Sequence, residues 1–261
     1  MQEKFAAANK AAWENKAYQA WVQAHGTPEE LAKKLHEVHR HLLRYWLKYI
    51  GDPAGKRVLN LLGSNGRKAI SLAILGADVT VVDISEQNRL YAMHTAEAAG
   101  VNVQYICSDA LRIPNEEALG QFDIVLMEFG IMHYFTDLDA ILSVVSRRLR
   151  SSGRYLLTDF HPFARMTAKP NEMVPNYFDD SSHEGDVAYT QLLPEQERAG
   201  LSKVLTRSWT AGDIITAVGT AGLFIRTFEE IPSSADPRLP QFYTLVADKA
   251  DVGLSPLFPP A

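Results

Sequence analysis

Four acidic residues follow apolar stretches of the sequence, each where a strand is expected to end: Asp83, Asp109, Glu128 and Asp159. In an open sheet of parallel strands, the carboxyl ends of the strands meet at one edge, and ligands bind beyond that edge. Carboxylates placed there can accept hydrogen bonds from hydroxyl or amine groups and can pair with an ammonium group. The pattern predicts a ligand site lined by acids at one edge of a sheet.

A glycine-bearing turn precedes these acids. The stretch VLNLLGSNGRKA, residues 58–69, reads as a strand, a turn with Gly63 and Gly66, and the start of a helix. Such a turn directs backbone N–H groups at a ligand, and glycine allows close approach. By itself it is equally typical of a plain strand-to-helix connection. Asp83, seventeen residues after Gly66, favours a nucleotide or cofactor, because an acid at such a distance can accept from both hydroxyls of a ribose.

The sequence alone also allows purely structural roles for these acids. Aspartate is a favoured N-cap residue, so Asp83 before SEQN is also consistent with capping a helix, and so is Asp109. For Asp83 the two roles do not exclude each other. Glu128 follows the apolar run IVLM and is also consistent with a surface carboxylate at a strand end.

The segments that must position these residues alternate between strands and helices from Lys56 onward. Five apolar strands, most with a crossover helix, predict a parallel, doubly wound sheet with helices on both faces. Two later strands, in LFIRTFEEIP and PQFYTLVADK, are joined by the loop SSADPRLP, so we expect antiparallel neighbours. The predicted fold is therefore α/β, with a mostly parallel seven-stranded sheet and an antiparallel final strand.

The first 50 residues read as helical. Thr27, Pro28 and Glu30 form a capping box with proline at the first helical position, and apolar residues recur at helical spacing until Gly51. The helix GTPEELAKKLHEVHRHLLRYWLKYIGD is preceded by a weaker one, AAWENKAYQAWVQAHG. The segment from about 161 to 209, which holds prolines, scattered aromatics and the acidic stretch DDSSHEGD, is interpreted as an insertion over the carboxyl ends of the strands.

Bulk properties exclude several classes of partner. The net charge of −5 and the pI of about 5.9 argue against binding to nucleic acid. No apolar run approaches the roughly 20 residues of a membrane span. MQEKFAAANKAAWENK lacks the apolar region of a signal peptide, and the lone Cys107 fits a reducing compartment, so we expect a cytoplasmic protein. His36, His39 and His41 do not share one helix face, so no metal site is expected.

Together, these segments resemble the class I S-adenosylmethionine-dependent methyltransferases that act on small molecules. The resemblance covers about residues 56–249 and rests on VLNLLGSNGRKA, VTVVDIS, ICSDALRIP, FDIVLMEFGIMHYF, LRSSGRYLLTDFHPF and the closing strand pair. It implies that residues 51–261 form a Rossmann-like domain that binds S-adenosyl-L-methionine, with residues 1–50 as a helical cap. The implied reaction is in-line methyl transfer to oxygen or nitrogen of a small-molecule acceptor, by a monomer or homodimer.

The resemblance also implies site residues. Asp83 would bind the ribose, Asp109 the adenine amine, and the loop from Gly63 to Gly66 would lie near the methionine moiety. The full set of implied cofactor contacts is Asn60, Gly63, Ser64, Asn65, Gly66, Asp83, Ile84, Asn88, Asp109, Ala110 and Glu128.

The first loop departs from the family pattern of acid-x-Gly-x-Gly-x-Gly. Aligned on Gly66, the chain has Asn60, Leu62 and Ser64 at the acid and first two glycine positions, with Gly63 displaced by one. Asn60 can accept a hydrogen bond but brings no charge. We therefore hypothesise that Glu128 supplies the missing negative charge beside the ammonium group of the cofactor.

His133 and His161 follow strands that in the family face the methyl-transfer centre, so each is a candidate general base. Each is also consistent with a hydrogen bond to a loop backbone. Tyr18, Trp21, Tyr134 and Tyr177 are candidate substrate contacts, and the aromatic residues of the N-terminal helices are partly expected in the core. The cap and the insertion at about 161–209 would form a lid over the substrate.

Two other functions remain open on sequence alone. One is a nicotinamide-dependent oxidoreductase on a Rossmann sheet, although GSNGRKA does not match G-x-G-x-x-G. The other is a relative that binds the cofactor without transferring its methyl group, which the altered first loop would allow.

Overall fold

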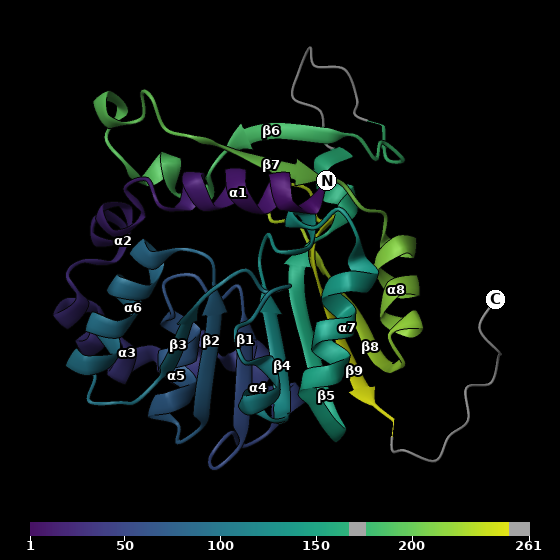
Figure 1. Cartoon of the computed structure of the whole chain (residues 1–261), viewed down its shortest axis with the longest axis horizontal. Helices are drawn as coiled ribbons and strands as arrows, with labels where there is room; N and C mark the ends of the chain where they lie inside the picture. Colours follow the sequence, from purple (N-terminus) through teal and green to yellow (C-terminus); the bar gives the residue numbers. More distant parts are fainter. Residues whose placement is uncertain (167–175, 251–261) are drawn as a thin grey trace.

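A seven-stranded sheet forms the centre of the computed structural model, which describes residues 1–166 and 176–250 (Figure 1). The strand order is β3-β2-β1-β4-β5-β9-β8. The strands are β1 (Arg57–Leu61), β2 (Asp78–Asp83), β3 (Gln104–Cys107), β4 (Phe122–Glu128), β5 (Leu149–Phe160), β8 (Leu223–Pro232) and β9 (Pro240–Lys249). Strands β1 to β5 pair in parallel, and β9 is antiparallel to both β5 and β8. The predicted α/β fold with an antiparallel final strand is confirmed.

Both faces of the sheet are buried, which explains why its strands read as continuous apolar runs. Val58 belongs to the hydrophobic cluster on one face, and the next residue, Leu59, belongs to the cluster on the other. The first face is covered by helices α3 (Pro28–Leu42), α4 (Arg44–Ile50), α5 (Arg67–Ile74) and α6 (Glu86–Ala98). Helices α7 (Leu138–Arg148) and α8 (Ala211–Thr220) cover the second face.

The N-terminal region forms four helices rather than the two expected. Helix α1 (Gln2–Trp13) and helix α2 (Ala17–His25) precede α3 and α4. The predicted capping box at Thr27 and Glu30 is present in both directions. The prediction of one helix up to Gly51 is wrong, because the chain leaves helical geometry at the fully buried Leu43 before α4 begins. The break lets Leu43 and Trp46 both pack into the core of the sheet face.

The N-terminal helices therefore lie in two places. Helix α3 packs against α5 and α6 on the face of the sheet, whereas α1 crosses the edge where the parallel strands end (Figure 1). The division of the chain at residue 50 stays a prediction.

The segment from His161 to Trp209 contains a second, two-stranded sheet of β6 (Ser182–Asp186) and antiparallel β7 (Lys203–Arg207). It also contains short 3-10 helices η3 (Pro162–Met166), η4 (Ala188–Leu192) and η5 (Glu195–Glu197). Two further 3-10 helices, η1 (Glu116–Leu119) and η2 (Met132–Tyr134), follow β3 and β4. Residues 167–175 of the expected insertion lie outside the described residues. Figure 1 shows β6 and β7 beside α1, over the carboxyl ends of the parallel strands.

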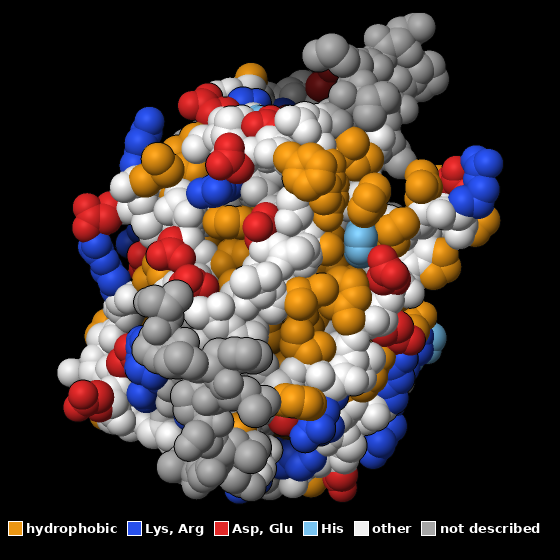
Figure 2. All heavy atoms as spheres, turned by 90° about the vertical axis from the view of Figure 1, so that its right-hand side faces the viewer, with side chains coloured by type: hydrophobic (Ala, Val, Ile, Leu, Met, Phe, Trp, Pro, Cys, Tyr) orange, Lys and Arg blue, Asp and Glu red, His pale blue; other side chains and the backbone are white. Residues whose placement is uncertain are grey.

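Strand β8 forms one edge of the large sheet. On the side of the molecule that carries α8 and β8, hydrophobic side chains lie between charged ones (Figure 2). Phe224 of this edge strand is 60% exposed, and the Arg226 guanidinium lies 4.6 Å from the centre of its ring. Charged residues on an edge strand disfavour pairing with another sheet.

Among the described residues, no helix has the length and apolar character needed to cross a bilayer.

Candidate functional site

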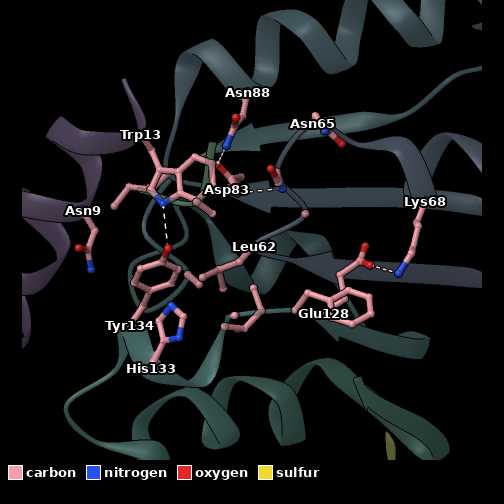
Figure 3. A pocket seen from close by; sticks show the side chains of 18 of the residues that line it. Asn9, Trp13, Leu62, Asn65, Lys68, Asp83, Asn88, Glu128, His133 and Tyr134 are labelled. Atoms are coloured by element: carbon pink, nitrogen blue, oxygen red, sulfur yellow. Dashed lines mark hydrogen bonds and ion pairs between the residues drawn. The ribbon is translucent and has the colours of Figure 1, made fainter. Parts of the chain in front are cut away.

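A cavity of about 580 Å³ opens beyond the carboxyl ends of β1 to β4, a size typical of sites for nucleotides and other small ligands. Helix α1 covers it, and the residues of α1 that line it, Gln2, Ala6, Asn9 and Trp13, are called the roof below. Figure 3 shows the cavity from close by. Twelve predicted site residues line it: Trp21, Gly63, Ser64, Asn65, Asp83, Ile84, Asn88, Asp109, Ala110, Glu128, His133 and Tyr134.

Two predicted cofactor contacts, Asn60 and Gly66, lie beneath the loop instead of in the cavity. Asn60 is 1% exposed, and its Oδ1 has no hydrogen-bond partner among the described residues. Gly66 begins α5 with φ +72°, and a Cβ there would lie 2.8 Å from the Cβ of Ala92 on α6. Glycine at 66 therefore serves the close packing of two helices as well as the turn.

The loop keeps a glycine-like backbone at two positions where the chain carries side chains. Leu62 has φ +51° and Ser64 has φ +50°, both in the left-handed region. Gly63 is outside that region, but a Cβ at 63 would lie 2.7 Å from Val81 Cγ1 and 2.8 Å from Asn60 Oδ1. The displaced glycine is thus required by packing, while Leu62 and Ser64 adopt the strained conformations.

Asp83 ties this loop to the end of β2. Its Oδ2 accepts a hydrogen bond from the Ser64 backbone N–H at 3.0 Å, and Oδ1 accepts from Ser85 N and Asn88 Nδ2 at 3.0 and 3.1 Å. Burial raises the pKa of Asp83, and these hydrogen bonds oppose that shift. A carboxylate has about four acceptor positions, so Asp83 keeps acceptor capacity on the cavity wall.

Trp21 joins the same network from α2. Its indole Nε1–H donates to Asn88 Oδ1 at 2.8 Å, which leaves the Asn88 amide nitrogen directed at Asp83. Trp21 is 9% exposed and stacks on His25 with the ring planes 2° apart. The predicted substrate contact is therefore also a core residue that orients a neighbour of Asp83.

Asp109 lines the cavity just after β3. Its Oδ1 accepts from the Leu111 N–H at 3.0 Å, in a turn that holds the carboxylate in place. The structure shows no partner for Oδ2 among the described residues, so this oxygen is available to an amine donor.

Glu128 is paired with a residue that the sequence did not single out. Its carboxylate forms an ion pair with Lys68 of α5 (Figure 3), and the two side chains are 15% and 14% exposed. The Lys68 ammonium also lies 4.1 Å from the centre of the Trp46 ring and 4.5 Å from that of Phe129. The hypothesis that Glu128 brings an unmatched negative charge therefore has to include Lys68.

His133 and Tyr134 form the wall below the roof. Tyr134 OH accepts from Trp13 Nε1 at 3.3 Å, and the His133 and Tyr134 rings meet edge to face at 4.3 Å (Figure 3). Neither ring nitrogen of His133 has a hydrogen-bond partner in the described part of the chain. Burial lowers the pKa of His133, with the Asp159 charge acting in the opposite direction.

Asp159 does not line this cavity, although sequence placed it with the other three acids. Its carboxylate accepts from the backbone N–H groups of Gly130, Ile131 and Met132, the last two at 3.1 Å. It therefore fixes the loop that carries His133.

The remaining predicted residues, His161, Tyr18 and Tyr177, lie outside the cavity. His161 Nδ1 accepts from the Phe163 N–H at 3.1 Å, and Nε2 lies 3.0 Å from Glu230 Oε1, so both ring nitrogens have neighbours. Tyr18 packs against Tyr91 and hydrogen-bonds His94 on the outer side of α6. Tyr177 stacks on the ring of Phe163.

The roof is fastened at both ends, which sequence reasoning missed. Gln2 Oε1 accepts from Thr136 N at 2.7 Å, and Gln2 Nε2 donates to Tyr134 O at 3.2 Å. At the other end, Ser85 Oγ donates to Trp13 O at 2.9 Å. These contacts join residues 72 to 134 positions apart, so no local sequence pattern predicts them.

Within residues 1–166 and 176–250, no cluster of three or more potential metal ligands occurs.

Comparisons with known proteins agree with this geometry. Residues 58–153 match the family model described as a methyltransferase domain. Demethylmenaquinone methyltransferase from Thermus thermophilus is 33% identical over 113 residues, 42% of this chain and 50% of that protein. A ubiquinone/menaquinone biosynthesis C-methyltransferase from Shewanella baltica is 29% identical over 128 residues, 47% and 50% of the two chains. The chain thus spans about half the length of these curated relatives.

Solved structures show the same fold. A putative S-adenosylmethionine-dependent methyltransferase from Listeria monocytogenes superposes with a TM-score of 0.61 at 21% identity, over 82% of this chain and 98% of that one. Magnesium protoporphyrin IX methyltransferase from Synechocystis, with bound SAH, gives 0.59 at 16% identity, over 94% and 99%.

Proposed function

We propose that this chain transfers the methyl group of S-adenosyl-L-methionine to a small-molecule acceptor, because residues 58–153 match the model of a methyltransferase domain and the sheet closes with the antiparallel strand predicted for that fold. One observation carries the proposal: Asp83, Asp109 and the loop after β1 face one covered cavity. The carboxylates suit the hydroxyl and amine donors of an adenosine, and the volume suits a nucleoside with a second small molecule.

Each part of the cavity has a role in this proposal. Asp83 accepts from the ribose hydroxyls through its remaining acceptor capacity, and Asp109 Oδ2 accepts from the adenine amine. Glu128 and Lys68 lie at the other end of the cavity, where one anion and one cation match the two charges of an amino acid (Figure 3). When bound, the cofactor supplies a methyl group that its positive sulfur makes electrophilic.

The protein's part in catalysis is to orient the acceptor and exclude water, because orientation alone can account for many orders of magnitude in rate. The roof and the segment with η4 cover the cavity, and Ala188 and Leu192 of η4 line it. His133 accepts the acceptor's proton, since burial keeps its imidazole neutral near pH 7. The acceptor atom is oxygen or nitrogen, as the sequence predicts, or an acidic carbon, as in the C-methyltransferase relatives.

Binding and turnover test the proposal separately. We expect S-adenosylmethionine and its demethylated product to raise the melting temperature, and NAD to leave it unchanged. We expect Asp83→Asn to weaken binding of the product about 10- to 100-fold, because it removes charged hydrogen bonds. Asp78→Asn is the matched control, since Asp78 begins the same strand and its side chain is 72% exposed.

Turnover is measured by transfer of labelled methyl groups from the cofactor to a small-molecule extract. Stabilisation by NAD alone would favour the oxidoreductase instead. Cofactor binding without any transfer would favour the non-catalytic relative.

A further inference from the structure

A second cavity of about 390 Å³ adjoins the first, and His133 and Phe160 line both. Its other walls come mainly from the end of β5, from η3, and from the end of β7 with the residues that follow it. These walls include several aromatic and basic residues: His161, Arg165, Arg207, Trp209 and Tyr243. The function proposed above leaves this space unassigned.

Arg207 is held by its neighbours in a fixed position on one wall. Its guanidinium lies 4.2 Å from the centre of the Trp209 ring, and Nη1 donates to Thr136 O at 3.1 Å. Trp209 is itself anchored through a hydrogen bond from Nε1 to Met132 O at 3.1 Å. The only carboxylate bound to Arg207 in the described part of the chain is Asp180, at 3.3 Å, and the Asp180 side chain is 81% exposed.

Arg165 lies on the wall formed by η3. Among the described residues it donates through Nη2 to the backbone oxygen of Tyr177 and has no carboxylate within ion-pair distance. The Nε atoms of Arg165 and Arg207 are both buried without a hydrogen-bond partner in the described part of the chain. Burial lowers the pKa of Arg165, and Asp179 opposes the shift from beyond the cavity. An anion beside these partly buried guanidinium groups can accept hydrogen bonds from N–H groups that the described residues leave without a partner.

The charges around this cavity favour an anionic ligand, in a chain whose net charge is −5. The acid that lines the cavity is Asp159, whose carboxylate is already bound to backbone N–H groups of the loop before His133. Glu230, beside His161, has a side chain 56% exposed. Burial lowers the pKa values of His133 and His161, so both are neutral near pH 7. Among the described residues that line the cavity, two guanidinium groups therefore stand against one carboxylate, while the acids that pair with them from outside, Asp179 and Asp180, do not line it.

We propose that the second cavity binds a carboxylate group of the methyl acceptor, with Arg165 and Arg207 as its specificity-determining residues. The guanidinium group matches a planar carboxylate through paired N–H donors. The rings of Phe160 and Trp209 line the same space and suit an aromatic body. The acceptor is then an aromatic acid whose reactive atom reaches His133, where the two cavities meet. This inference rests on the proposed methyltransferase function.

The test compares matched ligands on protein saturated with the demethylated cofactor. The probes are the hydroxybenzoic and hydroxyphenylacetic acids, each beside its uncharged amide, with binding measured by calorimetry. We expect the acids to bind at least about tenfold more tightly than their amides, as for hydrogen bonds to a charged group. The double variant R165Q/R207Q should lose this preference. The control R226Q makes the same kind of charge change on β8, outside both cavities, and should keep it.

Several results would overturn the proposal. They are equal binding of acids and amides, no binding of any probe to the loaded protein, or an acid preference that survives in R165Q/R207Q. Phenyl phosphate, added as a further probe, would overturn the carboxylate assignment if it bound more tightly than the hydroxybenzoic acids. R207K, which keeps the charge but loses the planar fork, should retain only part of the preference, and circular dichroism checks that each variant is folded. If the demethylated cofactor itself does not bind, the proposed function fails rather than this inference.

Discussion

Lys68 and Glu128 form an ion pair on the wall of the larger cavity, with only 14% and 15% of their side chains exposed. The negative charge that Asn60 does not provide is therefore present, but it is matched by a lysine of the chain itself. An ion pair exposes an anion and a cation side by side. Such a pair can exchange partners with a ligand that carries both charges, as the amino-acid end of the proposed cofactor does.

Glu128→Gln should weaken binding of the demethylated cofactor about tenfold, because it removes a charged acceptor for the ammonium group. Binding of 5′-methylthioadenosine, which lacks the amino-acid end, should stay the same. Calorimetry with both ligands measures the change in each affinity. Lys68→Gln should likewise weaken binding of the demethylated cofactor and leave binding of 5′-methylthioadenosine unchanged. Glu229→Gln is the control, since Glu229 forms a more exposed ion pair with Lys48. Equal affinities of the Glu128→Gln variant and the unaltered protein for the cofactor product would refute the role of Glu128.

The pH dependence of methyl transfer should report His133. Burial lowers its pKa below the ordinary 6.5, so the neutral base forms as pH rises through a value below 6.5. The rate should therefore rise along a limb with its midpoint below pH 6.5 and stay level above it. His133→Gln should remove the limb and slow turnover about 100-fold. His161→Gln should keep the rise of the rate with pH, because Phe163 and Glu230 already contact the two ring nitrogens of His161. If the rise survives in His133→Gln, His133 is not the base.

Ser64→Gly should stabilise the protein. A non-glycine residue in the left-handed region costs about 1–2 kcal/mol, and Ser64 has φ +50°. Glycine loses more conformational entropy on folding than serine does, and this loss offsets about 0.5–1 kcal/mol of the expected gain in stability. The net gain in the free energy of unfolding should be up to about 1.5 kcal/mol, measured by urea titration. Ser64→Ala keeps the Cβ and should bring no such gain, so equal stability of the two variants would contradict the explanation.

His25 should make the fold sensitive to mild acid. Burial and then the nearby Arg67 charge lower the pKa of His25 from 6.5 to about 4, and its Nε2 lies 3.1 Å from Arg67 Nη1. Between pH 6.5 and about 4 the unfolded chain binds a proton that the folded chain does not, so the free energy of unfolding falls as pH falls. His25→Gln should lessen the loss between pH 7 and pH 5. The exposed His41, changed to Gln, serves as the control, and an equal loss in both variants would exclude His25 as the cause.

The sheet and its acids were predictable because their signals are local. Each buried strand reads as an apolar run, and Asp83, Asp109 and Glu128 stand at or just after the ends of such runs. All three line the cavity. Asp159 shows the limit of this reasoning, since a carboxylate at a strand end can equally accept from a neighbouring loop.

Other parts of the site depend on contacts between distant segments. Nothing near Lys68 in the sequence indicates that Glu128, sixty residues later, lies against it. Strand β6 has the polar sequence SHEGD and is defined by its backbone pairing with β7. The left-handed backbone conformations of Leu62 and Ser64 could not be predicted from the sequence, because neither residue type favours that conformation.

The side chain of Asn9 in the roof forms two hydrogen bonds with the backbone of one residue of β7. Asn9 Nδ2 donates to Leu205 O at 3.1 Å, and Leu205 N donates to Asn9 Oδ1 at 2.7 Å, across 196 positions of the chain. During synthesis an N-terminal segment emerges long before such a partner. The contact between helix α1 and β7 can therefore form only after most of the polypeptide has left the ribosome. The cavity therefore becomes fully enclosed only late in synthesis, after strands β1 to β5 beneath it have been translated.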